Sequence, residues 1–451
     1  MKLFFLAALL SALSCYNLFS QNSGSKQTAI TVYNSNIAIV KDIRPLNLPK
    51  GNSIANLTDV AQLIDPTTVH IKFNGEVLEQ NYQYDLVSMD KILKRYIDKD
   101  IQLINEKGEL LEGTLLSVYG NQVVLKKKDA GLIMIPDIAK YRFGVGELPE
   151  GLIIKPTLKC LLNTETGGPQ DVEFSYQTSG ITWQAEYVAV LDAKDKMMDL
   201  NSWVSIENNC GTTFKNAELK LVAGDVHLVE KDEEEKAYSF VASGGVHKPQ
   251  LDERSLFEYH LYGLERKTTL ADRETKQISL FEKPGVGVTK KLLYDIGLSE
   301  NNEDDNVDVA IQFENKVSNH IGVPMPKGTV RIFKTDGNSI EFIGEDKVND
   351  IPRDDKVTLN IGSAFDVKAR TVQADYKKLS EHESAVTYLV TIKNHKDETI
   401  EVEARMYIKL GETVQSTTLD YIKEDASTIV FVPQVPANTD KEFTFTIREQ
   451  E

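Results

Sequence analysis

The chain has 451 residues, of which 41% are hydrophobic and 26% are charged, and its formal net charge is −17. This composition is typical of a globular protein, and the length predicts two to four domains, because one hydrophobic core rarely serves so long a chain. The negative charge disfavours nucleic acid and anionic lipid as partners, since both are bound through clustered lysine and arginine.

Residues 1–20 have the pattern of a secretory signal peptide. Lys2 supplies the positive charge, an apolar run follows, and a small-residue cleavage site ends at Ser20. Cys15 resembles a weak lipobox, but the residues after it stay apolar where a lipoprotein linker would turn polar. We therefore expect a periplasmic or secreted, cell-surface protein, with lipid anchoring at Cys15 as the less favoured alternative. No later stretch reaches the ~20 apolar residues of a transmembrane helix, so we expect no transmembrane segment.

Residues 27–97 predict an N-terminal β-unit. Two apolar runs, residues 29–33 and 37–40, are joined by an Asn-Ser-Asn turn, which predicts a hairpin. Apolar residues then recur at helical spacing behind Ser88, which is a suitable N-cap, so we expect one short helix from Ser88 to Ile97.

Residues 98–146 show a different rhythm, with short apolar runs between tight turns. This predicts a small SH3-like or Sm-like barrel that is inserted in the β-unit. Residues 147–230 then complete the β-sandwich of that unit. Sm-like barrels can bind RNA, and Lys126–Lys128 would be the basic patch. The leader, the acidic charge and the lack of interleaved aromatic residues instead favour a solvated hairpin tip.

The stretch from Tyr176 to Glu230 alternates aromatic and β-branched residues with Gly and Asn turns, which predicts consecutive antiparallel strands. Ile181, Trp183 and Tyr187 fall on one strand face, and we expect Trp183 and Trp203 to be buried. These aromatic residues can also be interpreted as a sugar-stacking platform, but their apolar neighbours favour core packing.

Motifs in and beyond this stretch carry a family resemblance. They are GITWxAxY from Gly180, NNCGT from Asn208, LVAGDV from Leu221, YHxY from Tyr259 and DRETK from Asp272. From about residue 28 onward the chain resembles a bacterial secreted family of unknown function, related to the C-terminal domain of mucoidy inhibitor A proteins. The resemblance implies a fold and no particular activity. Cys210 departs from the family pattern, which more often has Ser at that turn.

Residues 231–252 hold four consecutive acidic residues followed by Gly, Ser and Pro, which predicts a linker. The acidic run lacks the Asp-x-Asp-x-Asp-Gly spacing of a calcium loop. In the second half, strand-like runs end at or near Asn208, Asn315 and Asn394, and each is followed by a polar turn and another strand. Because Asn side chains bond turn backbone, this repetition predicts an immunoglobulin-like sandwich over residues 253–451.

Two cysteines, Cys160 and Cys210, follow the leader. Cys160 lies in an apolar strand, which favours two buried thiols. A disulfide is the alternative, since the sequence cannot place the two Cα atoms within the ~7 Å that a disulfide requires.

The candidate functional residues are polar residues that alternate along strands. Asp225 and His227 share one strand face, and His260 and Tyr262 share another with Glu258. A carboxylate with two imidazoles suits metal binding or acid–base catalysis, so a hydrolase or metal-dependent enzyme using Asp225, His227 and His260 is one hypothesis. Such residues more often form a solvated face, and neither an HExxH nor a GxSxG motif is present.

The sequence therefore predicts a mainly β protein, with tandem immunoglobulin-like sandwiches, a small inserted barrel and one short helix. The favoured function is a non-catalytic envelope protein that binds a protein or surface polysaccharide, without cofactor or metal. Its ligand-facing candidates are Asp225, His227, His260, Tyr262 and Trp183. Convergence of Asp225, His227 and His260 in one pocket would favour the enzyme alternative.

Overall fold

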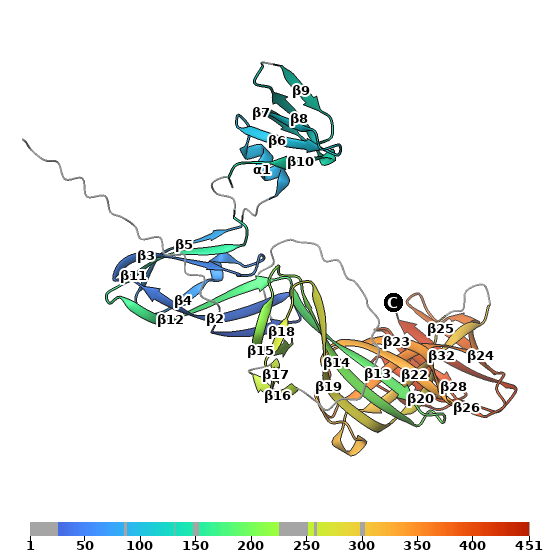
Figure 1. The fold of residues 1–451 in the computed structure, drawn as a ribbon. Helices are drawn as coiled ribbons and strands as arrows, with labels where there is room; N and C mark the ends of the chain where they lie inside the picture. The colour runs from blue at the N-terminus through green and yellow to red at the C-terminus, as the bar shows by residue number, and fades with distance from the viewer. Residues whose placement is uncertain are drawn as a thin grey trace, which may run out of the picture.

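The computed structural model describes residues 26–84, 88–129, 131–147, 153–224, 251–256, 259–297 and 303–450. These residues form a mainly β protein, so the predicted fold class is confirmed. Figure 1 shows strands gathered into successive sheets from the blue to the red end of the chain. Within the described ranges, no helix has the length and apolar character needed to cross a membrane. The helical segments described are α1 (Met89–Arg95) and three short 3-10 helices, Pro66–Thr68, Ile138–Lys140 and Val317–Asn319.

Two sheets form the first sandwich. The larger contains β1 (Gln27–Tyr33), β2 (Ile37–Leu48), β4 (His70–Lys72), β12 (Gly168–Ser179), β15 (Phe214–Ala223), β16 (Leu251–Leu256), β17 (Tyr259–Leu264) and β18 (Thr268–Leu270). Its order is β16-β17-β15-β1-β2-β12-β4, with β18 on β15. The smaller has the order β3 (Gly51–Thr58), β11 (Thr157–Thr164), β5 (Glu76–Gln83). Strand β2 buries every second side chain from Ala38 to Leu48, because successive residues point to opposite faces.

Strands on either side of the inserted segment pair directly with one another. Strand β11 lies between β3 and β5, and β12 lies between β2 and β4. Thr157, at the start of β11, is opposite Gln83, at the end of β5. The chain thus leaves the sheet and returns to it at adjacent positions.

The inserted segment forms a five-stranded sheet with its own core. Its order is β10 (Tyr141–Gly144), β6 (Asp100–Asn105), β7 (Leu110–Tyr119), β8 (Gln122–Lys126), β9 (Leu132–Ile135). First and last strands lie side by side, and α1 precedes them, as expected for an SH3-like or Sm-like barrel. Figure 1 draws this unit apart from the other sheets.

The predicted boundary between residues 97 and 98 is misplaced, because α1 belongs to the barrel. Leu93 and Tyr96 pack in the barrel core with Leu103 and Leu115. The Tyr96 hydroxyl donates to the carbonyl oxygen of Glu147 at 2.6 Å and accepts from its amide at 2.8 Å. Ser88 caps the helix as predicted, since its side chain accepts from the Lys91 amide.

A separate five-stranded sheet, called the second sheet below, combines strands from both sides of the predicted linker. Its order is β19 (Glu274–Gly287), β14 (Met197–Asn208), β13 (Ile181–Leu191), β22 (Gly328–Asp336), β23 (Ser339–Val348). Strands β16 and β17 likewise join the first sheet through β15. The predicted division at 231–252 therefore does not separate two sheets, although residues 225–250 themselves lie outside the described residues.

The C-terminal sheet curls around a separate core. Its order is β28 (Glu412–Thr417), β32 (Thr439–Gln450), β25 (Glu383–Asn394), β24 (Lys356–Lys378), β21 (Asp305–Glu314), β20 (Thr289–Asp295), β27 (Glu403–Tyr407), β30 (Thr428–Phe431), β29 (Tyr421–Lys423). A small pair, β26 (Ile400–Glu401) and β31 (Gln434–Val435), accompanies it. Phe431 of β30 packs on Phe443 and Phe445 of β32, with ring centroids 4.9 and 5.2 Å apart. Strands distant in the sheet order thus enclose one core.

The three predicted strand-end asparagines are buried and bond loop backbone. Their side-chain amides donate to two or three carbonyls each: Asn208 to residues 212, 270 and 271, Asn315 to 323 and 352, and Asn394 to 398, 435 and 436. In each case the strand that ends at the asparagine or one residue before it pairs with the strand that follows the last contacted loop, namely β14 with β19, β21 with β24 and β25 with β32. The sequence repetition therefore reflects a structural repetition.

Candidate functional site

A small pocket lies where the larger sheet of the first sandwich meets two loops, one before β22 and one after β23. Its volume is about 150 Å³. The residues that line it are Ala223, Gly224, His260, Tyr262, Pro324, Met325, Pro326, Asp350, Ile351 and Pro352. Reciprocal backbone hydrogen bonds between Met325 and Ile351, of 2.9 and 2.8 Å, hold the two loops together. Two of the predicted ligand-facing residues, His260 and Tyr262, thus line one pocket.

Tyr262 is the most unusual residue of the pocket. It is 3% exposed, and its hydroxyl makes no hydrogen bond to another described residue. Its ring packs edge-on against Trp183, with centroids 6.2 Å apart. Burial raises the pKa of Tyr262, and the negative charges of Glu253 and Asp350 raise it further. The hydroxyl is therefore neutral and can both donate to a ligand and accept from one.

The side chains of Glu253 and Arg353 hold His260 in place. Its Nδ1 lies 2.9 Å from Oε1 of Glu253, and Oε2 of Glu253 accepts from Arg353 at 3.0 Å. Glu253 and His260 come from the adjacent strands β16 and β17, and Arg353 follows the loop that carries Asp350. This arrangement fixes the imidazole and joins the first sheet to the second-sheet loop.

Asp350 provides a carboxylate at the same pocket. It is exposed, and its Oδ1 accepts from the Lys327 amide at 2.8 Å. Neither Lys nor Arg is among the residues that line the pocket. The pocket therefore combines a carboxylate and a hydroxyl with a wall made mainly of proline, Met325 and Ile351.

Gly224 allows the chain to pass close to β17. Its φ is +119°, and a Cβ atom there would lie 2.6 Å from the Tyr259 ring. A larger residue would both strain the backbone and displace that ring. Packing against Tyr259 thus explains why the LVAGDV motif has glycine at position 224.

Trp183 does not present a ligand-stacking face, although its ring packs against Tyr262 of the pocket. The side chain is 2% exposed, and its indole nitrogen donates to the Val222 carbonyl at 3.2 Å. Tyr187 is fully buried and donates to the Pro326 carbonyl at 2.6 Å. Trp203 is only half-buried, so the prediction of two buried tryptophans was wrong for Trp203. Trp203 lies on the face of β14 opposite to that of the buried Val204 and Ile206.

Asp225, His227 and Glu258 lie outside the described residues, so their convergence with His260 stays a prediction. Among the described residues, no group of three or more His, Cys, Asp or Glu side chains is arranged to hold a metal ion. The loops at Pro324–Pro326 and Asp350–Pro352 were not predicted as part of a site. Their residues are apolar or common turn residues, and only long-range strand pairing brings them to His260.

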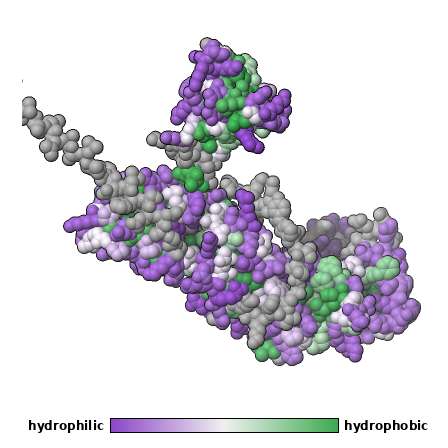
Figure 2. All heavy atoms as spheres, in the orientation of Figure 1, coloured by the Kyte–Doolittle hydropathy of each residue, from purple (hydrophilic) through white to green (hydrophobic). Residues whose placement is uncertain are grey.

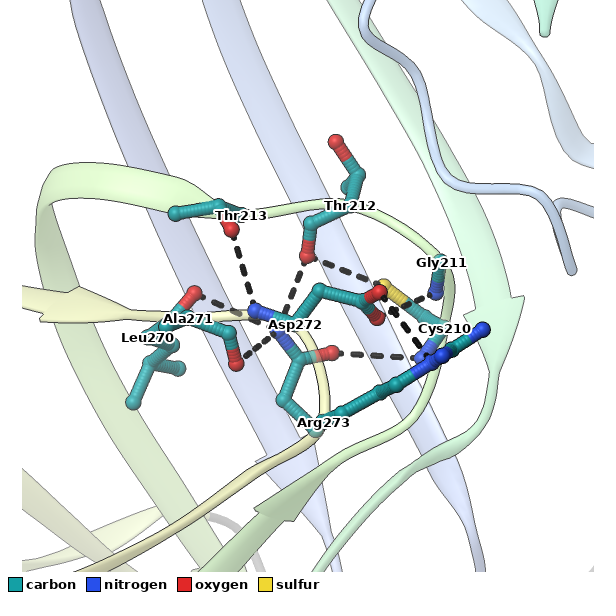
Figure 3. A network of polar contacts seen from close by, with 9 residues as sticks. Cys210, Gly211, Thr212, Thr213, Leu270, Ala271, Asp272 and Arg273 are labelled. Atoms are coloured by element: carbon teal, nitrogen blue, oxygen red, sulfur yellow. Dashed lines mark hydrogen bonds and ion pairs between the residues drawn. The ribbon is translucent and has the colours of Figure 1, made fainter. Parts of the chain in front are cut away.

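The NNCGT motif forms a turn that is fixed by hydrogen bonds (Figure 3). Asp272 points into this turn, where its Oδ1 accepts from the Gly211 amide at 2.9 Å, and its own amide donates to Thr213. Asn208 Oδ1 accepts from the Cys210 amide at 3.2 Å. Cys210 is buried and free, and so is Cys160, so the two-thiol prediction is confirmed over the disulfide. This motif and the DRETK motif are thus two sides of one structural junction.

Hydrophobic side chains gather on the barrel over β8 and β9 (Figure 2). Leu132 and Met134 of β9 are 59% and 76% exposed. Lys126–Lys128 are exposed in the hairpin between these strands, and the Lys127 amide donates to the Gly131 carbonyl. The basic run is therefore at a hairpin tip, where the sequence placed it.

A comparison with models of protein families gave no match, and neither did a comparison with curated proteins.

Proposed function

We propose that this protein is a non-catalytic binding module of the cell envelope, which holds a partner protein or a surface polysaccharide. The observation that carries the proposal is the Tyr262 hydroxyl, buried without a described partner in a pocket between strands β15 and β17 and two loops. Nearly all buried polar groups in proteins are hydrogen-bonded, so such a hydroxyl is suited to a bound ligand. The proposed relation to mucoidy inhibitor A proteins rests on the sequence motifs alone.

One observation favours the hydrolase alternative. Glu253 orients His260 through Nδ1, which is the geometry of a general base with its orienting carboxylate. The described lining residues include no Ser, Thr or Cys that would serve as a nucleophile. A binding role needs only the pocket, whereas hydrolysis also needs the residues predicted at 225 and 227.

Affinity capture from native envelope extracts tests the proposal. We expect the wild-type protein to retain a discrete partner, and the double substitution Tyr262→Phe with Asp350→Asn to lose it. Asn360→Ala, an exposed change on β24, serves as the matched control and should retain the partner. Equal retention by all three proteins would show that the pocket is not the binding site. Loss of retention with His260→Ala alone, together with partner cleavage by wild type, would favour the hydrolase.

We propose periplasmic or cell-surface localisation from the leader. The mature protein should then begin near Gln21, which intact-mass analysis of protein from the native host measures. A diacylglycerol adduct on Cys15 would show that the protein is a lipoprotein instead.

A further inference from the structure

The pocket presents hydrogen-bond acceptors to a ligand, and it does so in a negative field. Asp350 is exposed, and the Tyr262 hydroxyl is buried and has no described partner. The Arg353 charge is paired with Glu253, which also holds His260. A cationic donor therefore suits this pocket better than an anion.

Apart from His260, the remainder of the wall is apolar. Pro324, Pro326 and Pro352 contribute rigid hydrocarbon surface, and Met325 lines the pocket at 1% exposure. Apolar walls of this kind cover methylene groups while a charged head reaches polar partners at the end. A pocket of about 150 Å³ accommodates one such side chain.

We propose that the pocket binds a primary ammonium group on an alkyl stem, and that the occupant is a lysine side chain of a partner protein. The ammonium donates to the Asp350 carboxylate and to the Tyr262 hydroxyl, and the methylene groups lie against the prolines. This assignment rests on the proposed binding function and names the chemistry of that same site. A polysaccharide of neutral or acidic sugars offers neither the positive charge nor the unbranched hydrocarbon stem.

Titration with n-butylammonium chloride, followed by calorimetry or by amide chemical shifts, tests the assignment. We expect n-butylammonium to bind. The neutral counterpart n-butanol should bind at least about tenfold more weakly. Asp350→Asn should weaken n-butylammonium binding about tenfold, and Tyr262→Phe by a smaller factor of about three. Asp336→Asn, a carboxylate exposed on β22 away from the pocket, should leave it unchanged.

Two peptides separate the sources of the ammonium. A capped Gly-Gly-Lys-Gly-Gly peptide should bind at least as tightly as n-butylammonium, and its Nε-acetylated form should not bind. Binding of n-butylammonium without the peptide would assign the site to free small amines and overturn the protein partner. Equal binding of n-butanol, or no effect of Asp350→Asn, would overturn the ammonium assignment altogether. If envelope capture still depends on the pocket while n-butylammonium does not compete, the proposed function stands and this assignment fails.

Discussion

Buried asparagines close three loop junctions of this protein. Asn208, Asn315 and Asn394 are each 1% exposed or less, and none has a positive φ. The left-handed conformation that Asn tolerates is therefore not what these positions use. They use the side-chain amide, whose donors and acceptor reach loops on both sides of a strand end.

Replacing one of these asparagines should destabilise the protein markedly. In Asn394→Ala the carbonyls of Glu398, Val435 and Pro436 lose their donor, and the Lys396 amide loses its acceptor. We expect the free energy of unfolding to fall by about 3 kcal/mol, because unsatisfied buried polar groups keep their desolvation cost. Urea unfolding measures the change, with exposed Asn360→Ala as control. A change below about 1 kcal/mol would show that water replaces the amide.

The two buried thiols should be inert in the native protein. Burial raises the pKa of both Cys160 and Cys210 to about 12, so the reactive thiolate is scarce at pH 8. We expect iodoacetamide to label neither residue in the native state and both after denaturation, as read by intact mass. Rapid labelling of the native protein, or a mass two hydrogens lower after denaturation, would contradict this description.

Part of the site follows from the local sequence pattern, and the rest depends on contacts between distant strands. Strand alternation placed His260 and Tyr262 on one face, because a two-residue period is a local property. Asp350 and Pro326 reach the same pocket only through the pairing of β22 with β13 and β23. Pairing between strands so far apart in sequence leaves no local pattern.

In the barrel, the local sequence pattern predicts the strands and turns but not the core to which each element belongs. Its strands and turns follow from short apolar runs, and its hairpins from the turn residues. The boundary between the β-unit and the barrel was misplaced because Leu93 and Tyr96 pack forward into the barrel, while helical spacing alone does not say which core a helix joins. The parallel pairs β1 with β15, β13 with β22 and β20 with β27 were also beyond local reasoning.

Removal of the whole barrel should leave the first sandwich folded. Deleting residues 85–152 and joining the ends by a short Gly/Ser linker connects β5 to β11 where Gln83 already faces Thr157. We expect cooperative thermal unfolding to persist, since the barrel core is separate from the sandwich core.

A deletion of only 98–146 is the informative comparison. This deletion leaves α1 without the core on which it packs. The shortened protein should therefore bind hydrophobic dyes, and the chain at Leu93 should become accessible to proteases. Loss of cooperative unfolding in the larger deletion as well would show that the barrel contributes to the sandwich.

At the scale of the whole molecule, the described sheets interlock along the chain. The first core draws on residues from Ile30 to Leu359, and the C-terminal core on residues from Leu292 to Ile447. Ion pairs tie paired strands together, including Lys291 of β20 with Glu403 of β27 at 2.6 Å. Stability should therefore depend on the ionisation of such carboxylates.

Acid should destabilise the C-terminal sheet. Burial raises the pKa of Glu403, but hydrogen bonds and charges from Lys291 and Arg405 outweigh it, and the net pKa lies below the usual 4.5. A lowered folded-state pKa means that the stabilisation is present above pH 4.5 and is lost as the pH falls below it.

Urea unfolding at a series of pH values measures this dependence. We expect Glu403→Gln to lower stability at pH 7 and to make the decline below pH 4.5 shallower. Glu381→Gln, in an exposed loop, should reproduce the wild-type profile. A Glu403→Gln profile parallel to wild type would show that the ion pair contributes nothing to the acid transition.

We propose that a partner occupies the pocket of Tyr262 and Asp350 in the envelope. Photo-crosslinking in the native host tests it directly, with benzoylphenylalanine placed at Pro352, an exposed pocket-lining position, or at Asn360 as control. We predict a discrete crosslinked adduct from position 352 that disappears when Tyr262→Phe and Asp350→Asn are added, and none from position 360. Equal adducts from both positions, or no adduct from position 352, would contradict the account.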